Sequence, residues 1–447
     1  MNVLAAPRAL AGSWLKQPPG LAILFLTQMW EIFSYYGMRT LLVYYMTKQL
    51  HFGQQHASLV YGVYIATFYF TPILGGVVSD RWLGRKRSVI IGAAIMSFGH
   101  FLMASESLLY FALAAIALGN GLFLPSLPSQ IDDLYAKDDP RRGSAYNFYY
   151  VGINVGGLLA PLVCGTLGEL YGWHWGFGAA GVGMLAGLAI YTLGARWLPP
   201  ERPRVRDVVP DATPALPRAA MRQRVLTLFA IFLCVTVFRG AYEQTGNTIA
   251  LWADVGLDRT LGSFTIPMTW FQSLNPLLVI FLTPLLVALW TKQAGRGREM
   301  SPAKKMSMGA FTVAAAFLML AFVDATSNAT GGTGHAHWLW LALFFLVFTI
   351  GELFVLPIGL SLFARLAPAR HAATTIAAWY LASFSGNLFA GALGTLWSAM
   401  GHAAFFGAMG GVAVVAGTLL RLVDPAVARA EAPADGVRPD DWQEKQA

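Results

Sequence analysis

The chain has 447 residues, of which 56% are hydrophobic and only 12% are charged. A soluble domain carries about 25% charged residues, so the composition excludes a soluble protein and indicates one that crosses a membrane many times. The two cysteines lie in apolar runs, which excludes a disulfide framework. The sequence contains no glycine-rich phosphate loop, which argues against an ATP-driven pump.

Apolar stretches long enough to cross a bilayer recur along the chain, since a helix of about 20 residues spans the hydrocarbon core. The stretches are continuous, whereas a membrane β-strand alternates over about 10 residues, so we predict helices. The twelve predicted spans are 20–47, 57–79, 88–105, 108–131, 143–169, 174–197, 225–253, 265–290, 304–324, 338–364, 372–399 and 402–423.

A polar stretch rich in proline and arginine divides these spans into six and six. We therefore predict an N-terminal six-helix bundle over 1–195, a cytoplasmic linker over 196–224 and a C-terminal six-helix bundle over 225–423. The polar residues 424–447 predict a disordered cytoplasmic tail.

The basic residues predict the orientation of the chain. With both termini in the cytoplasm, all but four of the 31 Lys and Arg residues lie on the cytoplasmic side, and the exceptions are Lys48, Arg259, Arg39 and Arg239. This asymmetry follows the positive-inside rule, and we expect a multi-pass protein of the plasma (inner) membrane. It also explains the net charge of +8 without a nucleic-acid partner.

The loop after the second span, residues 75–87, reads GGVVSDRWLGRKR. It resembles the G-x-x-x-D-R-x-G-R-R loop of the major facilitator superfamily. The resemblance implies a gating motif in which Asp80, Arg81 and Arg85 form a charge relay. With six plus six spans, the expected fold class is an all-α membrane protein of the twelve-span major facilitator fold, with two six-helix bundles related by pseudo-two-fold symmetry.

Five charged residues lie inside predicted spans, namely Glu31, Arg39, Arg239, Glu243 and Glu352. A charge at membrane depth costs at least about 2.5 kcal/mol, so we expect these side chains to face the bundle interior or a wet cavity. Arg39 lies eight residues after Glu31, with Tyr35 between them on the same helix face. The alternative is a polar stripe that only holds helices together.

The pair Arg239 and Glu243 leaves two interpretations open. The two side chains could neutralise each other at their spacing of four residues. Glu243 could instead pair with Arg39 of the other half, as a latch that forms in one access state and breaks in the other. Glu352 precedes Pro357 in a segment that also contains glycine, and such residues mark a broken helix beside a cavity.

Two longer motifs resemble the proton-dependent oligopeptide transporter (POT or PTR) family. Residues 31–39 read EIFSYYGMR and resemble the span-one motif E-x-x-E-R-F-x-Y-Y-G, and residues 148–156 read FYYVGINVG and resemble the span-five signature F-Y-x-x-I-N-x-G. Shorter matches follow in the family's order as far as about residue 395.

The resemblance implies proton-coupled symport of di- and tripeptides into the cell by alternating access. A free peptide carries an ammonium and a carboxylate, and Glu352 would bind the first and Arg39 the second. Asn154 and Asn275 would bind the peptide's amide. The aromatic residues expected to line side-chain pockets are Tyr35, Tyr36, Tyr64 and Trp379.

The chain departs from the family at three charged positions. Gln28 replaces the first acid of the span-one motif, Ile32 replaces its arginine, and Leu124 stands where the family usually has a lysine. Burial without a counter-charge favours the neutral form of a carboxyl group. We therefore expect proton coupling to survive, with Glu31 as the main proton site and Glu243 as the second. Weak coupling or a different stoichiometry is the alternative.

The same residues are compatible with two other functions. A major facilitator exporter or symporter of amino acids or drug-like compounds is the first alternative, because an amino acid presents the same two charged ends. A sensor built on a transporter fold is the second. The sequence indicates neither a cofactor, a metal site nor an enzyme, and the expected partners are small peptides, protons and the lipid bilayer, with the chain as a monomer.

Overall fold

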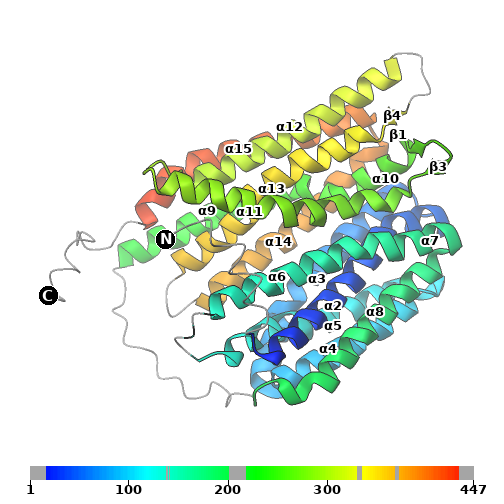
Figure 1. Cartoon of the computed structure of the whole chain (residues 1–447). Coiled ribbons are helices and arrows are strands. Elements are labelled where there is room, and N and C mark those ends of the chain that lie inside the picture. The colour runs from blue at the N-terminus through cyan, green and yellow to red at the C-terminus, as the bar shows by residue number, and fades with distance from the viewer. Residues whose placement is uncertain are drawn as a thin grey trace.

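The computed structural model describes residues 17–136, 139, 141–200, 218–329, 335–367 and 372–431, and helices make up most of it (Figure 1). The first half contains α2 (Pro19–Tyr44), α3 (Gln54–Val78), α4 (Arg85–Leu102), α5 (Leu109–Ser126), α6 (Arg142–Ala160), α7 (Thr166–Tyr171) and α8 (Trp173–Gly194). The second half contains α9 (Arg218–Tyr242), α10 (Thr248–Val255), α11 (Leu274–Ala294), α12 (Pro302–Ala329), α13 (Leu339–Leu366), α14 (Ala372–Gly394) and α15 (His402–Glu431).

Each of the twelve predicted spans corresponds to a helix or a helix pair. Within the described residues, ten helical segments are long and apolar enough to cross a membrane on length and composition alone. The segments formed by α2 and α4 are the remaining two. In α2 the polar side chains of Thr27, Gln28, Glu31 and Ser34 are buried, so they lower its hydropathy without facing lipid.

In several spans the α-helix passes into a π-helical or 3-10 turn. Span five bends at Pro161, which begins a π-helical turn between α6 and α7, because proline cannot donate the helical hydrogen bond. Span seven breaks at Asn247, whose φ of −116° and ψ of −93° separate α9 from α10. Span eight starts with the 3-10 turn Met268–Ser273 before α11.

The sequence predicted no strands, and the structure contains short ones in two loops. Leu257–Asp258 (β1) pairs in parallel with Ala336–His337 (β4). Thr260–Leu261 (β2) pairs with Phe264–Thr265 (β3) in a hairpin. These strands lie at the same end of the molecule as α7 and α10 (Figure 1), and we call it the strand end.

Helix extends into parts of the chain where the sequence predicted linker and tail. α9 begins at Arg218 and α15 continues to Glu431. Glu431 pairs with Arg365 of α13 at 3.3 Å, and Asp424 pairs with Lys304 of α12 at 3.6 Å, so ion pairs fasten the last turns of α15 to its neighbours. The rest of the predicted linker and tail, 201–217 and 432–447, lies outside the described residues.

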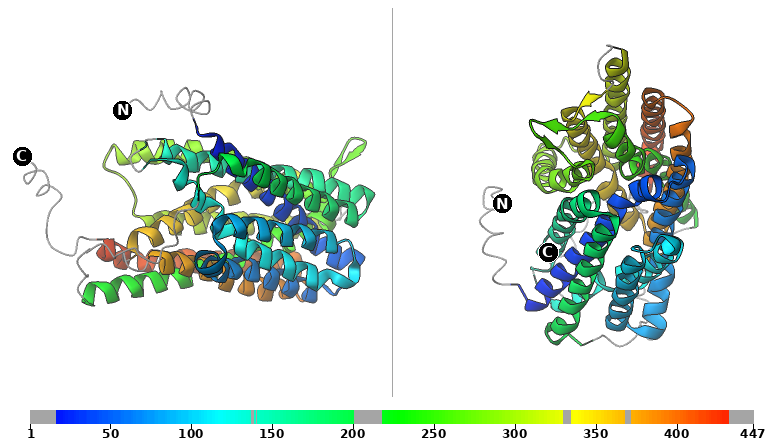
Figure 2. Two further views of the ribbon diagram at one scale, coloured as in Figure 1. Left: turned by 90° about the horizontal axis from the view of Figure 1, so that it is seen from below. Right: turned by 90° about the vertical axis from the view of Figure 1, so that its right-hand side faces the viewer.

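The two halves pack side by side, with α3 against α14 and α6 against α11 (Figure 2). Glycines set the closest approach between α3 and α14. A Cβ atom added to Gly62 would lie 2.5 Å from the Cα of Gly391. The backbones of the two halves therefore touch at this point, and no larger side chain fits there without moving a helix.

Large apolar side chains cover the outside of the helices. Leu193, Phe111 and Leu422 are 76%, 71% and 70% exposed. A soluble protein rarely exposes so much apolar surface, and a surface of this kind suits lipid contact.

Candidate functional site

Glu243 binds arginines from both halves of the protein. It follows α9 in the 3-10 turn Glu243–Gly246 and is 2% exposed. Its Oε2 accepts a hydrogen bond from Nη2 of Arg39 on α2 at 2.9 Å, and its Oε1 accepts one from Nη1 of Arg239 on α9 at 2.6 Å. Both predicted pairings of this carboxylate are therefore present together, and Glu243 joins the two halves.

Aromatic side chains hold the Arg39 guanidinium in place. Its Nε donates to the hydroxyl of Tyr61 on α3 at 2.7 Å. The guanidinium also lies 5.6 Å from the ring centre of Tyr36 and 6.0 Å from that of Tyr61. Such distances allow cation–π attraction. Arg39 is thus oriented toward the second half by contacts within the first half.

Glu352 lies on α13 and receives hydrogen bonds on both carboxylate oxygens. Tyr242 donates to Oε1 at 2.8 Å, and Asn275 donates to Oε2. Asn275 also donates to Thr349 at 3.0 Å. Both donors are neutral, and no ion pair to Glu352 occurs among the described residues. Glu352 is half-buried, and its carboxylate is therefore oriented by neutral donors with no cation in direct contact among the described residues.

The charged residues form one linked cluster. Arg39 lies 5.6 Å from the ring centre of Tyr36 and pairs with Glu243, and Tyr242, which precedes Glu243, donates to Glu352. The charged groups come from α2, the turn after α9, and α13. Arg39, Glu243 and Glu352 thus lie together at the junction of the halves, and Glu31 does not join them.

Glu31 lies in a separate polar cluster inside the first half. Its side chain is 1% exposed, and Oε2 accepts a hydrogen bond from Nε2 of Gln28 at 2.7 Å. The hydroxyl of Tyr149 on α6 donates to the other end of Gln28, so the amide is oriented with its NH₂ toward Glu31. In the part of the chain that the structure describes, no cation pairs with Glu31.

The other predicted binding residues divide into two groups. Tyr35 stacks on Phe68 at 4.2 Å and meets Tyr36 edge-on at 5.3 Å, which places it beside Arg39's aromatic neighbours. Tyr64 is also buried, on α3. Trp379 packs at 5.4 Å against Phe363 in the core of the second half, so the structure does not group it with the other aromatics.

Asn154 lies on α6 and is 7% exposed. Its amide donates to the backbone oxygen of Tyr150 at 3.0 Å. Tyr150 itself is 41% exposed and lies within electrostatic range of Glu352. This span-five segment therefore faces the same junction as Glu352.

The predicted gating loop is held through Arg85. Arg85 pairs with Asp133 at 2.7 Å and donates to the backbone oxygen of Ser129 at 2.9 Å. Asp80 and Arg81 are exposed, and among the described residues neither makes an ion pair. The structure thus ties one of the three predicted relay residues to the segment that follows α5.

Contacts between the halves close the strand end. Lys48 of the first half pairs with Asp254 of the second at 2.7 Å. Glu169, at the end of α7, accepts hydrogen bonds from the backbone N–H groups of Met268 and Thr269 at 3.1 and 2.8 Å. It thereby caps the 3-10 turn that begins span eight, where the unpaired N–H groups of a helix start attract a negative charge.

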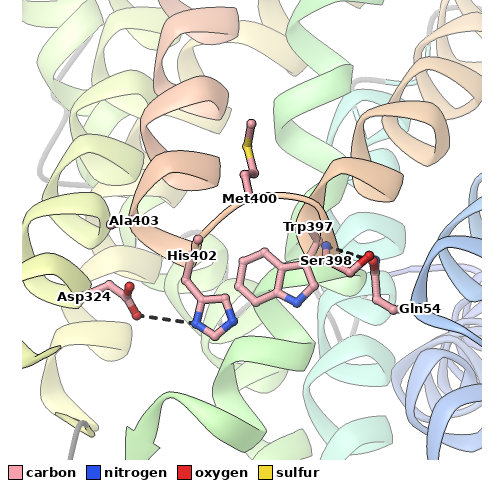
Figure 3. Close-up of a pocket in the computed structure, with 8 residues that line it drawn as sticks. Gln54, Asp324, Trp397, Ser398, Met400, His402 and Ala403 are labelled. Atoms are coloured by element: carbon pink, nitrogen blue, oxygen red, sulfur yellow. Dashed lines mark hydrogen bonds and ion pairs between the residues drawn. The ribbon is translucent and has the colours of Figure 1, made fainter.

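A surface pocket of about 640 Å³ lies at the same end (Figure 3). Gln54 of α3 lines it, donates to the backbone oxygen of Gly394 at 2.8 Å and accepts from the N–H of Ser398 at 3.2 Å. On its far side His402 lies between Asp324 and Trp397 (Figure 3), with its ring stacked on Trp397 at 4.3 Å. The pocket is therefore built around another clamp between the halves.

Sequence reasoning missed several residues that complete the site. Tyr242 adjoins Glu243 and Tyr149 belongs to the span-five signature, so both lay beside residues that the sequence had identified. Tyr61 had no such neighbour. Glu169 gave no signal, because its partners are backbone groups about 100 residues later in the chain.

Comparisons with known proteins place the chain among transporters. A family model described as "POT family" matches residues 86–224 and 217–409. The "Di-/tripeptide transporter" of Lactococcus lactis subsp. cremoris is 30% identical and the alignment covers 92% of this chain and 96% of the relative. The "Uncharacterized transporter YclF" of Bacillus subtilis is 32% identical, over 92% of this chain and 95% of the relative.

Solved structures agree in fold. A crystal structure of "peptide transporter POT in complex with sulfate" superposes with a TM-score of 0.84 at 29% identity, and covers 92% of this chain and 96% of that chain. The match spans both halves and is therefore a likeness of the whole architecture. The twelve-span protein described here belongs to the POT family.

Proposed function

We propose that the protein transports di- and tripeptides into the cell by proton-coupled symport, through alternating access of its two halves. The observation that carries this proposal is that Arg39 and Glu352, opposite in charge and contributed by opposite halves, belong to one cluster linked through Glu243 and Tyr242. A zwitterionic peptide needs both charges, and the named relatives are peptide transporters. The function is transport rather than catalysis.

Each predicted binding residue has a role in this proposal. Glu352 binds the peptide's ammonium group and Arg39 binds its carboxylate. Both contacts are charge-assisted hydrogen bonds, which are stronger than neutral ones. Asn154 and Asn275 bind the amide. Side-chain pockets are lined by Tyr35, Tyr36, Tyr64 and Trp379. Of these, Trp379 packs in the core of the second half, so its contribution is through that packing.

Binding and opening are linked through Arg39. The peptide's carboxylate competes with Glu243 for this guanidinium, so substrate entry weakens the latch between the halves. Glu31 is the main proton site and Glu243 the second. Asp80, Arg81 and Arg85 gate the end opposite the strand end.

The membrane context completes the proposal. The protein is a monomer in the plasma (inner) membrane with both termini in the cytoplasm, which makes the strand end extracellular. Each proton that enters yields about 2.3 kcal/mol per 100 mV of membrane potential. This permits roughly fiftyfold accumulation of a neutral peptide.

The deciding experiment is peptide uptake into proteoliposomes with and without an imposed inward proton gradient. Labelled alanyl-alanine should accumulate only with the gradient, and tripeptides should compete whereas free alanine should not. Competition by free alanine would favour an amino-acid symporter. Accumulation that ignores the gradient would rule out proton coupling.

A further inference from the structure

The two oxygens of Glu243 are bound by two different arginines, and the two arginines belong to different moving parts. Arg39 lies on α2 in the first half, whereas Arg239 lies on α9, one helical turn before Glu243 itself. When the halves separate, Arg39 leaves with the first half. Arg239 travels with Glu243, because both residues are on the same segment.

A latch with only one arginine would behave differently. Separating that arginine from a buried carboxylate leaves an unpaired charge, which is costly enough that the carboxylate takes up a proton instead. Opening and proton uptake would then be the same event. In this chain Arg239 lies 2.6 Å from Oε1 on the same segment as Glu243, so release of Arg39 would still leave the carboxylate with a partner.

The surroundings hold Arg239 in this position. Gly386 of α14 faces it, and a Cβ atom there would lie 2.5 Å from the Cβ of Arg239. The guanidinium lies 5.2 Å from the ring of Tyr69 on α3 and 5.7 Å from that of Tyr242. The charged and titratable groups around the pair are thus Arg39 and Tyr36 from α2, Tyr61 and Tyr69 from α3, Tyr242 from α9 and Glu352 from α13.

We propose that Arg239 is a positioning residue that keeps Glu243 ionised throughout the transport cycle, so that the latch opens without protonating Glu243 and Glu31 alone carries the coupled proton. This inference rests on the proposed function and refines it. It removes Glu243 as the second proton site. It also fixes the stoichiometry at one proton for each neutral peptide.

The wild-type protein provides the first test. The reversal potential of peptide transport in proteoliposomes gives the number of protons moved per neutral dipeptide. We expect one, whereas a value of two would overturn the inference. Because this measurement requires active peptide transport, an inactive wild type would count against the proposed function and not against the role of Arg239.

Variants of Arg239 provide the second test, measured as peptide counterflow at equal pH on both sides. The variants are made in the Glu31→Gln background, whose counterflow needs no proton at residue 31 and should be nearly independent of pH. In Arg239→Met, release of Arg39 should require a proton on Glu243, so counterflow should fall roughly tenfold per pH unit on the alkaline side, as expected for one titrating group. Arg239→Lys keeps the charge and should retain the flat profile. A flat profile in Arg239→Met would overturn the inference.

Double variants separate this role from a merely structural one. Glu243→Gln combined with Arg239→Met should abolish the acquired pH dependence, and persistence would assign it to another group such as Glu352 and overturn the inference. Glu31→Gln combined with Arg239→Met should regain proton-driven accumulation that Glu31→Gln alone lacks, because Glu243 then takes the proton. A structural defect would lower transport in every assay and could not produce this gain.

Discussion

Tyr242 donates a hydrogen bond to Glu352 at 2.8 Å, and it immediately precedes Glu243, which holds both arginines. The proposed ammonium site and the latch between the halves are therefore connected through one peptide bond of span seven. We therefore expect a displacement of either carboxylate to shift the other through this short segment.

Removal of the Tyr242 hydroxyl should weaken this connection. Tyr242→Phe leaves the ring in place but deprives Glu352 of one donor. A hydrogen bond to a charged group contributes about 1.5 kcal/mol, so we expect the apparent affinity for dipeptides to fall roughly tenfold, measured as the concentration that half-saturates counterflow. An unchanged affinity would show that the bond at 2.8 Å has no part in binding.

Removal of the Glu352 carboxylate should discriminate between peptides. Glu352→Ala should weaken binding of peptides with a free amino end more than binding of N-blocked peptides, because only the former carry an ammonium group. Competition against labelled alanyl-alanine measures both affinities. Equal losses for the two kinds of peptide would refute the assignment of Glu352 to the ammonium.

Glu31→Gln should abolish proton-driven accumulation and leave counterflow exchange intact, because the amide has nearly the same shape but cannot carry a proton. Glu106→Gln is a matched control, since Glu106 is an exposed carboxylate that accepts a hydrogen bond from Gln49. Undiminished accumulation in Glu31→Gln would remove Glu31 from the mechanism.

Glu169→Ala should destabilise closure of the strand end. The substitution leaves the N–H groups of Met268 and Thr269 without their acceptor, at a cost of about 1–3 kcal/mol. Spin labels at the exposed positions Tyr171 and Phe264 should then report a larger share of long distances across the strand end. Glu169→Gln keeps one acceptor oxygen and should have a smaller effect, and an unchanged distribution in Glu169→Ala would contradict the clamp.

The sequence predicted the order of the spans and the residues of the central cluster because charges in apolar helices are costly wherever the helix sits. The sequence left open whether Glu243 pairs with Arg39 or with Arg239, and the structure contains both pairs. The break at Asn247 was not predictable, because its only local signal is the adjoining Gly246, and glycine is common within membrane helices. The contacts of Glu169 and the stack of Trp379 on Phe363 depend on how distant helices meet, which periodicity does not encode.

The touching backbones at Gly62 and Gly391 have a consequence for how the transporter responds to its environment. Bare main chain at this crossing carries no ionisable group, and short-range contact is indifferent to ionic strength, unlike the exposed attraction between Lys48 and Asp254. A rise in ionic strength should therefore weaken the ion pair between Lys48 and Asp254 at the strand end but not the glycine crossing, so the two halves stay in contact there until α3 and α14 themselves move apart.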